Sequence, residues 1–257
     1  MVFAYMGPME RMPALPLFDF LEDVPDGEEV AADDTSIGSG GDAVVPCSWL
    51  HALDNVCDPF HVPILHGLIS GLQFTDVLSG MPACEFASTQ RGVKVVQERE
   101  RSDGTTFRRV TEAMLPNIRL VPSPRPTTFD ACNKVGWIVP IDDTNHRIFI
   151  LARVPKGGIP AELYRQTFEE RGWHKLSEAE HQRMPGDFEA QVSQGPIALH
   201  SEEHLATSDR GIVMLRRKLR EQLTELAQGR DPVNTVIGSA EVRISVEAGK
   251  FLIGSAS

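Results

Sequence analysis

The sequence has few cysteines, and they follow no recognised metal-binding or disulfide pattern. The chain of 257 residues contains four, at Cys47, Cys57, Cys84 and Cys132. Their spacing is irregular and no C-x-x-C pair occurs, which argues against a cysteine-based zinc or iron–sulfur site. Sparse, unpaired thiols are typical of a reducing compartment, so we expect a cytoplasmic protein.

The sequence also lacks a long apolar run and an excess of positive charge. No stretch is long enough to cross a bilayer, and no charged-then-apolar start marks a signal peptide. The formal net charge is −11. Nucleic acids and anionic membrane surfaces are polyanions, so we expect neither as the main partner.

The chain does contain enough apolar sequence for a substantial core, with 41% hydrophobic residues. A helical pattern begins at residues 47–53, "CSWLHAL". The segment 92–115 alternates on both sides of Asp103-Gly104, which predicts a β-hairpin. Further strands are predicted at 117–122, 135–142 and 146–154. Their spacing leaves no room for helical crossovers, so the sheet should be antiparallel.

Helical patterns return in the second half of the chain. One predicted helix covers 160–172 and begins with a proline in its first turn. A longer one begins at Thr207 or Ser208 and ends at Gly229. Its apolar positions keep helical spacing, which predicts one face packed on the sheet: Ile212, Leu215, Leu219, Leu223 and Leu226. The basic stretch "RRKLRE" (216–221) should be the solvated face. Helix, sheet and covering helix together predict an α+β fold.

The segment "DNVCDPFHVPILHG" (54–67) carries the candidate chemistry. His61 and His66 are five residues apart, about 140° around a regular helix, so an undistorted helix cannot direct both at one ion. Pro63 lies between them and removes an N–H, which gives a physical reason for a local break. Two histidines and a carboxylate from elsewhere would form the facial triad of non-haem iron oxygenases, which leaves positions open for oxygen and substrate.

Long segments resemble one enzyme family. "CSWLHALDNVCDPFHVPILH" (47–66) resembles the iron-binding segment of the catalytic subunits of Rieske non-haem iron oxygenases. Residues 183–223, which include "PGDFEAQ", are similar to the corresponding stretch of the phthalate 4,5-dioxygenase-like branch. "VFAYMGPMERMPALPLF" (2–18) resembles the connector that follows the Rieske domain in that family.

The resemblance implies roles for five side chains. His61, His66 and Asp187 fall on the three iron ligands of the family. Asp58 falls on the bridging aspartate, which links an iron-binding histidine to the Rieske cluster of a neighbouring subunit. Asp54 falls where relatives place a further polar side chain near the iron. Asp54 and Asp58 are therefore the expected catalytic residues beside the metal ligands.

The resemblance also implies an architecture and an activity. The family's catalytic domain is a curved antiparallel sheet covered by helices, similar to helix-grip, START-like ligand carriers. This chain would then comprise a connector with an acidic loop (1–45), an iron-binding catalytic domain (46–232) and a tail packed on it (233–257). The implied activity is Fe(II)-dependent insertion of O₂-derived oxygen into an aromatic substrate, an aromatic carboxylate in this branch, as part of aromatic hydrocarbon catabolism.

One element of the family pattern does not occur. The family binds its [2Fe–2S] cluster through a C-x-H pair and a C-x-x-H pair, and neither pair is found in this sequence. We therefore expect the cluster in a Rieske domain or subunit that acts in trans, with electrons from an NAD(P)H-dependent reductase. By the same resemblance a homotrimer is expected, and the chain alone should be inactive.

Two readings from other classes remain open. The string "HSEEH" fits the H-x-x-E-H zinc-peptidase signature, with His200 and His204 on one helical face and Glu203 as the base. Alternatively, the helix-grip fold would serve only as a non-catalytic ligand-binding module or an inactive fragment. Iron content separates this carrier hypothesis from the oxygenase hypothesis.

Overall fold

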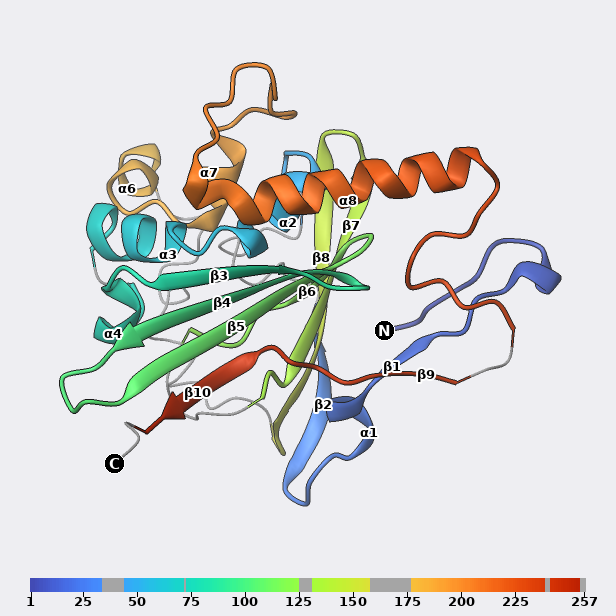
Figure 1. The fold of residues 1–257 in the computed structure, drawn as a ribbon, viewed down its shortest axis with the longest axis horizontal. Helices are drawn as coiled ribbons and strands as arrows, with labels where there is room; N and C mark the ends of the chain where they lie inside the picture. Colours follow the sequence, from blue (N-terminus) through green and yellow to red (C-terminus); the bar gives the residue numbers. More distant parts are fainter. Residues whose placement is uncertain (34–43, 72, 125–130, 158–176, 239–240, 255–257) are drawn as a thin grey trace.

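A computed structural model describes residues 1–33, 44–71, 73–124, 131–157, 177–238 and 241–254. Its centre is an eight-stranded sheet in the order β2-β8-β7-β6-β5-β4-β3, with β10 paired to β5. Figure 1 shows that β3, β4 and β5 run at a steep angle to β7 and β8, so the sheet is strongly twisted and curved. Every pairing in this sheet is antiparallel, which confirms the predicted α+β class.

The strands and helices have the following bounds. The strands are β1 Pro16–Phe18, β2 Glu28–Asp33, β3 Ala83–Ser88, β4 Gly92–Glu100, β5 Thr106–Met114, β6 Ile118–Leu120, β7 Lys134–Asp142, β8 Asn145–Pro155, β9 Val242–Ile244 and β10 Gly249–Ile253. The helices are α1 Asp19–Glu22, α2 Trp49–Cys57, α3 His61–Pro63, α4 Asp76–Ser79, α6 Glu178–Arg183, α7 Asp187–Val192 and α8 Arg210–Ala227. Shorter turns are η1 Met9–Arg11, η2 Ile64–Ile69 and η5 Thr207–Asp209.

The predicted hairpin forms where the turn residues indicated it. β4 and β5 pair over nine residues in register from Gly92↔Met114 to Glu100↔Thr106. The turn between them closes through hydrogen bonds between Arg101 and Thr105, and Gly104 adopts φ 79°. A residue without a Cβ accepts that backbone conformation without strain, so the Asp-Gly signal was sufficient to fix this register.

Two cores lie on opposite faces of the sheet. On one face, α2 and α8 cover a cluster that includes Leu53, Val95, Ile138 and Leu215. On the other face, the chain around β1, α1 and β9 packs a second cluster against the sheet: Phe18, Phe20, Leu120, Val135 and Ile244. Because side chains alternate along each strand, β5 and β7 contribute to both cores. The face under α2 and α8 is called the helix-facing side below (Figure 1).

The connector and the tail both pair with distant strands. The acidic loop of the connector (22–43) was expected to be exposed, but Glu28–Asp33 forms β2, which pairs with β8 at the edge of the main sheet. The tail contributes two strands that do not pair with each other, since β9 pairs in parallel with β1 and β10 pairs with β5. Long-range pairing partners leave no local signal, whereas a hairpin turn does. The helix predicted at 160–172 lies outside the described residues.

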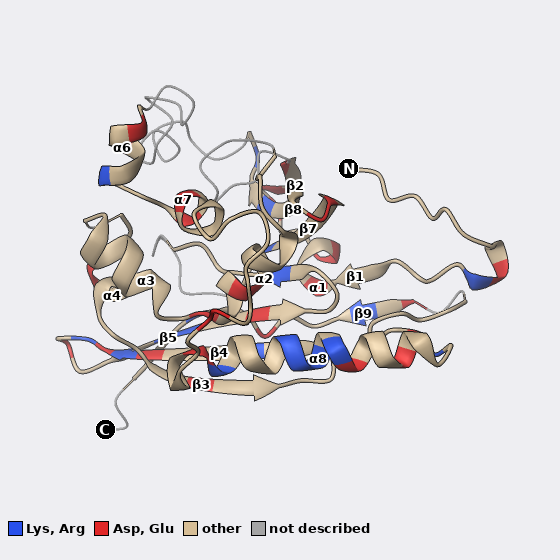
Figure 2. Ribbon diagram, turned by 90° about the horizontal axis from the view of Figure 1, so that it is seen from above, with Lys and Arg blue, Asp and Glu red and all other residues tan. Residues whose placement is uncertain are grey.

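The long helix α8 ends just before Gly229 as predicted, but it differs from its prediction at its start and in the burial of its second half. It begins at Arg210 after a short 3-10 turn, and neither Thr207 nor Ser208 caps it with its side chain. Leu215 is fully buried against the sheet, whereas Leu223 is 65% exposed and Leu226 is 49% exposed. Only the first half of the helix therefore packs as predicted. Figure 2 shows basic and acidic positions interspersed along α8.

No helix in the described parts of the chain combines the length and apolar character that crossing a membrane requires.

Candidate metal centre

His61, His66 and Asp187 meet at one place although they come from distant parts of the chain. Each offers one ligand atom, and the three atoms lie within 4.8 Å of one another. Nε2 of His66 is 3.1 Å from Oδ1 of Asp187, and Nε2 of His61 is 3.7 Å from the same oxygen. Among the described residues this is the one group of three or more histidine, cysteine or carboxylate side chains with metal-binding geometry.

The local backbone explains how two histidines five residues apart can face one point. α3 spans only His61–Pro63, and the chain then continues as the π-helical turn η2. The amide of Ser70 donates to the oxygen of Leu65, a bond between residues five apart, at 3.0 Å. In a π-helix such a bond closes each turn, so residues five positions apart lie on the same side. The break predicted at Pro63 thus takes the form of a change from α to π geometry.

Hydrogen bonds on the far side of each ring fix which nitrogen faces the cluster. Nδ1 of His61 lies 2.5 Å from the backbone oxygen of Asp58. Nδ1 of His66 lies 2.6 Å from Oε1 of Gln73. Both partners are acceptors, so each Nδ1 donates its proton and each Nε2 is directed toward Asp187, where it can bind a metal ion or, in protonated His66, donate to the carboxylate. Outer-sphere acceptors on Nδ1 are the usual way in which proteins orient metal-binding imidazoles.

Asp187 is held at the first position of α7 by its surroundings. The amide of Gly186 donates to Oε2 of Glu189 at 2.7 Å, which caps the helix. The oxygen of Pro185 accepts from the hydroxyl of Ser70 at 2.5 Å and from the amide of Gln73 at 3.4 Å. The segment that carries Asp187 is therefore bound directly to the segment that carries the histidines. The side chain of Gln73 bonds to both segments, through His66 and through Pro185.

The three side chains shift one another's pKa. Burial lowers the pKa of His66, but the hydrogen bond and charge of Asp187 outweigh burial and raise it overall. Burial lowers the pKa of His61 by more than the charges of Asp187 and Asp58 restore. Burial alone would raise the pKa of Asp187, but the hydrogen bond from His66 and the charges of both histidines hold it well below its usual range. An ionised carboxylate beside imidazoles suits a divalent cation.

Asp58 contacts His61 and reaches the surface. Its Oδ1 accepts from the amides of Phe60 at 2.8 Å and His61 at 3.2 Å, and its Oδ2 lies 3.9 Å from Nδ1 of His61. The Asp58 side chain is 29% exposed. It therefore occupies a position between His61 and the exterior, on the side of the ring that faces away from Asp187.

Asp54 lies in a different environment from the one expected. Its Oδ2 accepts from Nη2 of Arg216 at 2.6 Å and from Nε at 3.1 Å. The side chain that contacts the cluster is instead the neighbouring Asn55, whose Nδ2 donates to Oδ1 of Asp187 at 3.1 Å. Neither Asn55 nor Gln73 was predicted from the sequence, because a neutral amide carries no charge or spacing signal of its own.

The buried ion pair of Asp54 contradicts two further predictions. Arg216 was expected on the solvated face of the long helix, but it is 8% exposed and also bonds Glu203 through Nη2 at 2.9 Å. Glu203 therefore binds an arginine. Residues 200–204 form a turn and irregular backbone, so His200 and His204 do not share a helical face as the peptidase hypothesis requires. No metal cluster forms there among the described residues.

Comparison with known proteins gives a consistent result. No family model matches the sequence. The chain is 39% identical to the phenoxybenzoate dioxygenase subunit alpha of Ectopseudomonas oleovorans, over 98% of this chain and 62% of that protein. It is 31% identical to the tert-butanol monooxygenase/tert-amyl alcohol desaturase oxygenase subunit of Aquincola tertiaricarbonis, over 94% of this chain and 54% of that protein.

Solved structures share the fold at lower sequence identity. NdmA of Pseudomonas putida CBB5, determined as a mutant with caffeine, superposes with a TM-score of 0.55 at 15% identity. That match covers 88% of this chain and 61% of the solved one. NdmB of the same organism gives a TM-score of 0.54 at the same identity. The chain spans between 54% and 62% of the length of the two relatives named above. Over that length, the chain is a homologue of these oxygenase subunits, in agreement with its resemblance to the Rieske non-haem iron oxygenase family.

Proposed function

We propose that His61, His66 and Asp187 bind a single Fe(II) ion and that the chain is the catalytic portion of an oxygenase. The observation that carries this proposal is the convergence of three ligand atoms within 4.8 Å, with both Nδ1 atoms already bonded to acceptors. Three protein ligands leave coordination positions open. Iron held there would supply O₂ activation next to the substrate.

The proposed reaction is insertion of O₂-derived oxygen into an aromatic substrate. The similarity to a phenoxybenzoate dioxygenase subunit supports an aromatic carboxylate and ring hydroxylation. The second relative is named for an aliphatic alcohol, so the choice of substrate rests on the first relative and on the chemistry of this chain. A carrier that only binds a ligand would have no use for the three converging donors.

Each residue around the site has a proposed task. Gln73 and the backbone of Asp58 hold the two imidazoles with Nε2 directed at the metal position. Asn55 orients the carboxylate of Asp187 through its amide. The partly exposed carboxylate of Asp58 lies next to His61, where it is suited to connect the site to an external electron donor.

We infer that activity requires further partners. These are a Rieske [2Fe–2S] domain or subunit, an NAD(P)H-dependent reductase and the homotrimer of the family. No C-x-H or C-x-x-H pair in this sequence offers the cluster its ligands. A cytoplasmic location remains a prediction from the four free cysteines.

An anaerobic Fe(II) titration with metal analysis tests the proposal. The wild-type chain should bind one Fe(II) per chain, and His61→Ala and Asp187→Ala should each lose it. His200→Ala is the matched control, because that histidine lies outside the cluster and should leave binding unchanged. A wild-type chain that takes up no Fe(II), or variants that bind it as the wild type does, would refute the iron site.

A further inference from the structure

The helix-facing side of the sheet carries a row of cations that are buried (Arg99, Arg109 and Lys250) or half-buried (Arg119 and Lys134). Side chains that lie directly opposite one another share a face, and this face carries one cation on each of five strands. They are Arg99 on β4, Arg109 on β5, Arg119 on β6, Lys134 on β7 and Lys250 on β10. Arg99 and Arg109 are each 5% exposed.

The described residues provide no carboxylate partner for three of these cations. Arg109 donates from Nη2 to the oxygen of Pro122 at 3.3 Å, and its buried Nε has no partner. The side chains of Arg119 and Lys134 make no hydrogen bond or ion pair with any described residue. Buried cations are almost always paired, because removing a charge from water is costly unless an opposite charge compensates.

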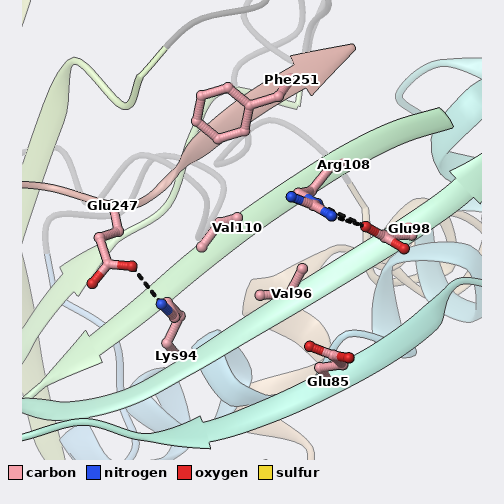
Figure 3. A pocket seen from close by; sticks show the side chains of 8 residues that line it. All are labelled: Glu85, Lys94, Val96, Glu98, Arg108, Val110, Glu247 and Phe251. Carbon is pink, nitrogen blue, oxygen red and sulfur yellow. Dashed lines mark hydrogen bonds and ion pairs between the residues drawn. The ribbon is translucent and has the colours of Figure 1, made fainter. Parts of the chain in front are cut away.

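The opposite face of the same strands behaves differently. Figure 3 shows a hollow there in which each cation has an acidic partner. Lys94 pairs with Glu247, and Nη2 of Arg108 lies 2.5 Å from Oε1 of Glu98. Arg108 and Arg109 are neighbours in sequence, yet only Arg108, the exposed one, forms an ion pair with a carboxylate. The lack of partners is therefore a property of the helix-facing side.

These cations also repel one another. Burial, followed by the nearby charge of Arg99, lowers the pKa of Arg109 to about 10. Burial, together with the charges of Arg119, Arg109 and Lys250, lowers the pKa of Lys134 to about 8. An arrangement of like charges in a low-dielectric region destabilises the fold unless an anion joins it.

The row lies next to the proposed iron site. The charge of Asp187 acts on both Arg109 and Arg119, and the charge of Arg109 acts on His66. The aliphatic part of the Arg119 side chain lies across Gly136 on the neighbouring strand. A Cβ added to residue 136 would lie only 2.9 Å from Cγ of Arg119. Gly136 thus leaves the space that Arg119 occupies.

We propose that Arg109, Arg119 and Lys134 bind the carboxylate of the substrate that reacts at the His61–His66–Asp187 site, an inference that rests on the proposed function. A carboxylate would supply a directly bonded anionic partner, which no described residue gives to these three side chains. A guanidinium binds a carboxylate through two parallel hydrogen bonds, which would fix the orientation of the ring relative to the metal position. These residues would then select acids over neutral analogues of the same shape.

Benzoate and its neutral analogue benzamide test the inference by calorimetry on the metal-free chain. Metal is removed so that the carboxylate cannot bind iron directly. Benzoate should bind about tenfold or more tightly than benzamide, because only the acid neutralises the row. Equal binding of the two compounds, or no binding of benzoate, would overturn the proposal.

Two neighbouring arginines provide a matched pair of variants. Arg109→Met and Arg119→Met should each weaken benzoate binding about tenfold and leave benzamide binding unchanged. Arg108→Met removes a charge from the opposite face and should have no effect on either compound. Wild-type benzoate affinity in both helix-facing variants, or an equal loss in Arg108→Met, would contradict the assignment.

The number of protons taken up on benzoate binding tests whether Lys134 contacts the anion, because a purely structural role of Lys134 would not change it. Benzoate binding at pH 8 should take up protons, because a nearby carboxylate restores the charged form of Lys134, whose pKa burial lowers to about 8. Calorimetry in buffers of different ionisation enthalpy measures this uptake. Lys134→Met should abolish it, and uptake that persists in this variant would contradict the role of Lys134.

Fe(II) titration of the same proteins separates the two proposals. Arg119→Met should bind Fe(II) as the wild type does, since Arg119 is not a ligand. Selective benzoate binding in a chain that cannot bind Fe(II) would support the anion site and refute the iron function. Normal Fe(II) binding with no preference for benzoate would refute the anion site alone.

Discussion

Nε2 of His66 lies 3.1 Å from Oδ1 of Asp187, although 121 residues separate them in the sequence. The contact joins the π-helical turn after α3 to the first residue of α7. The same two atoms would be metal ligands in the proposed site. Protonation of His66 and metal binding therefore compete for one position, and the first prediction follows from this competition.

The histidines of the metal-free protein should titrate in opposite directions. The pKa of His66 is raised by Asp187, so its midpoint should lie above the ordinary value of about 6.5, whereas buried His61 should titrate below it. Proton NMR of the ring resonances measures both. Asp187→Asn should lower the midpoint of His66. A midpoint for His66 below that of His61 would contradict the described hydrogen bonding.

The same shift predicts a pH dependence of stability. A raised folded-state pKa means that the contribution of His66 is fully present below its unfolded pKa and is lost as the pH rises through the folded value. The difference in free energy of unfolding between wild type and His66→Gln should therefore shrink above about pH 6.5. Urea unfolding of the metal-free proteins from pH 5 to 9 measures it. A difference that grows with pH would have the wrong sign.

Gln73 should tune metal affinity without being a ligand. Its Oε1 accepts the Nδ1 proton of His66 at 2.6 Å, so Gln73→Leu removes the group that orients this ring. We expect Fe(II) affinity to fall roughly 10–100-fold, as is usual for outer-sphere partners of metal-binding histidines. Gln73→Glu keeps an acceptor oxygen and should retain most of the affinity. Equal losses in both variants would show that the acceptor is not what matters.

Asp58→Asn should separate electron supply from metal binding. The asparagine oxygen can still accept from the amides of Phe60 and His61, so the local turn and the bound Fe(II) should persist. Turnover in a system reconstituted with a Rieske protein and reductase should fall steeply, because the charge beside His61 is lost. If Asp58→Asn loses Fe(II) as completely as His61→Ala, the assigned roles are wrong.

Asp54 should matter for stability more than for metal binding. Arg216→Met leaves the carboxylate of Asp54 buried without its partner, which should cost about 3–5 kcal/mol in the free energy of unfolding. The double variant Asp54→Asn/Arg216→Met should recover part of this loss. Arg217→Met is the control, since Arg217 is 80% exposed in its side chain and should change stability little. Loss of Fe(II) binding by Asp54→Asn without loss of stability would instead favour a role at the iron.

The sequence predicted the parts of this fold that have local signals. Asp103-Gly104 fixes a hairpin because only a few residue types accept its turn. The pairing of β2 with β8, and of β10 with β5, depends on contacts between distant segments, and no local pattern reports them. The burial of Arg216 could have been predicted from its position on the helix. It lies four residues after Ile212 and directly after buried Leu215, which places it beside the apolar face.

The candidate site was predictable from resemblance more than from spacing. The two histidines of the motif were visible, but nothing in their spacing indicated that the carboxylate would come from Asp187. Gln73 reaches the cluster from the bend after η2 and Asn55 reaches it from α2, and a neutral amide has no sequence signature of this role. The cation row was hidden because its members are spread over five strands and come together only in the sheet.

The distance along the chain between His66 and Asp187 has a consequence for unfolding. A metal ion bound to both would join the two ends of a segment that contains strands β3 to β8. Unfolding separates these two residues and would release the ion, so the bound ion would stabilise the folded state by an amount that grows with the free metal concentration, about 2.7 kcal/mol at one hundred times the dissociation constant. The proposed catalytic ion would thereby also act as a reversible cross-link that couples metal supply to the persistence of these six strands.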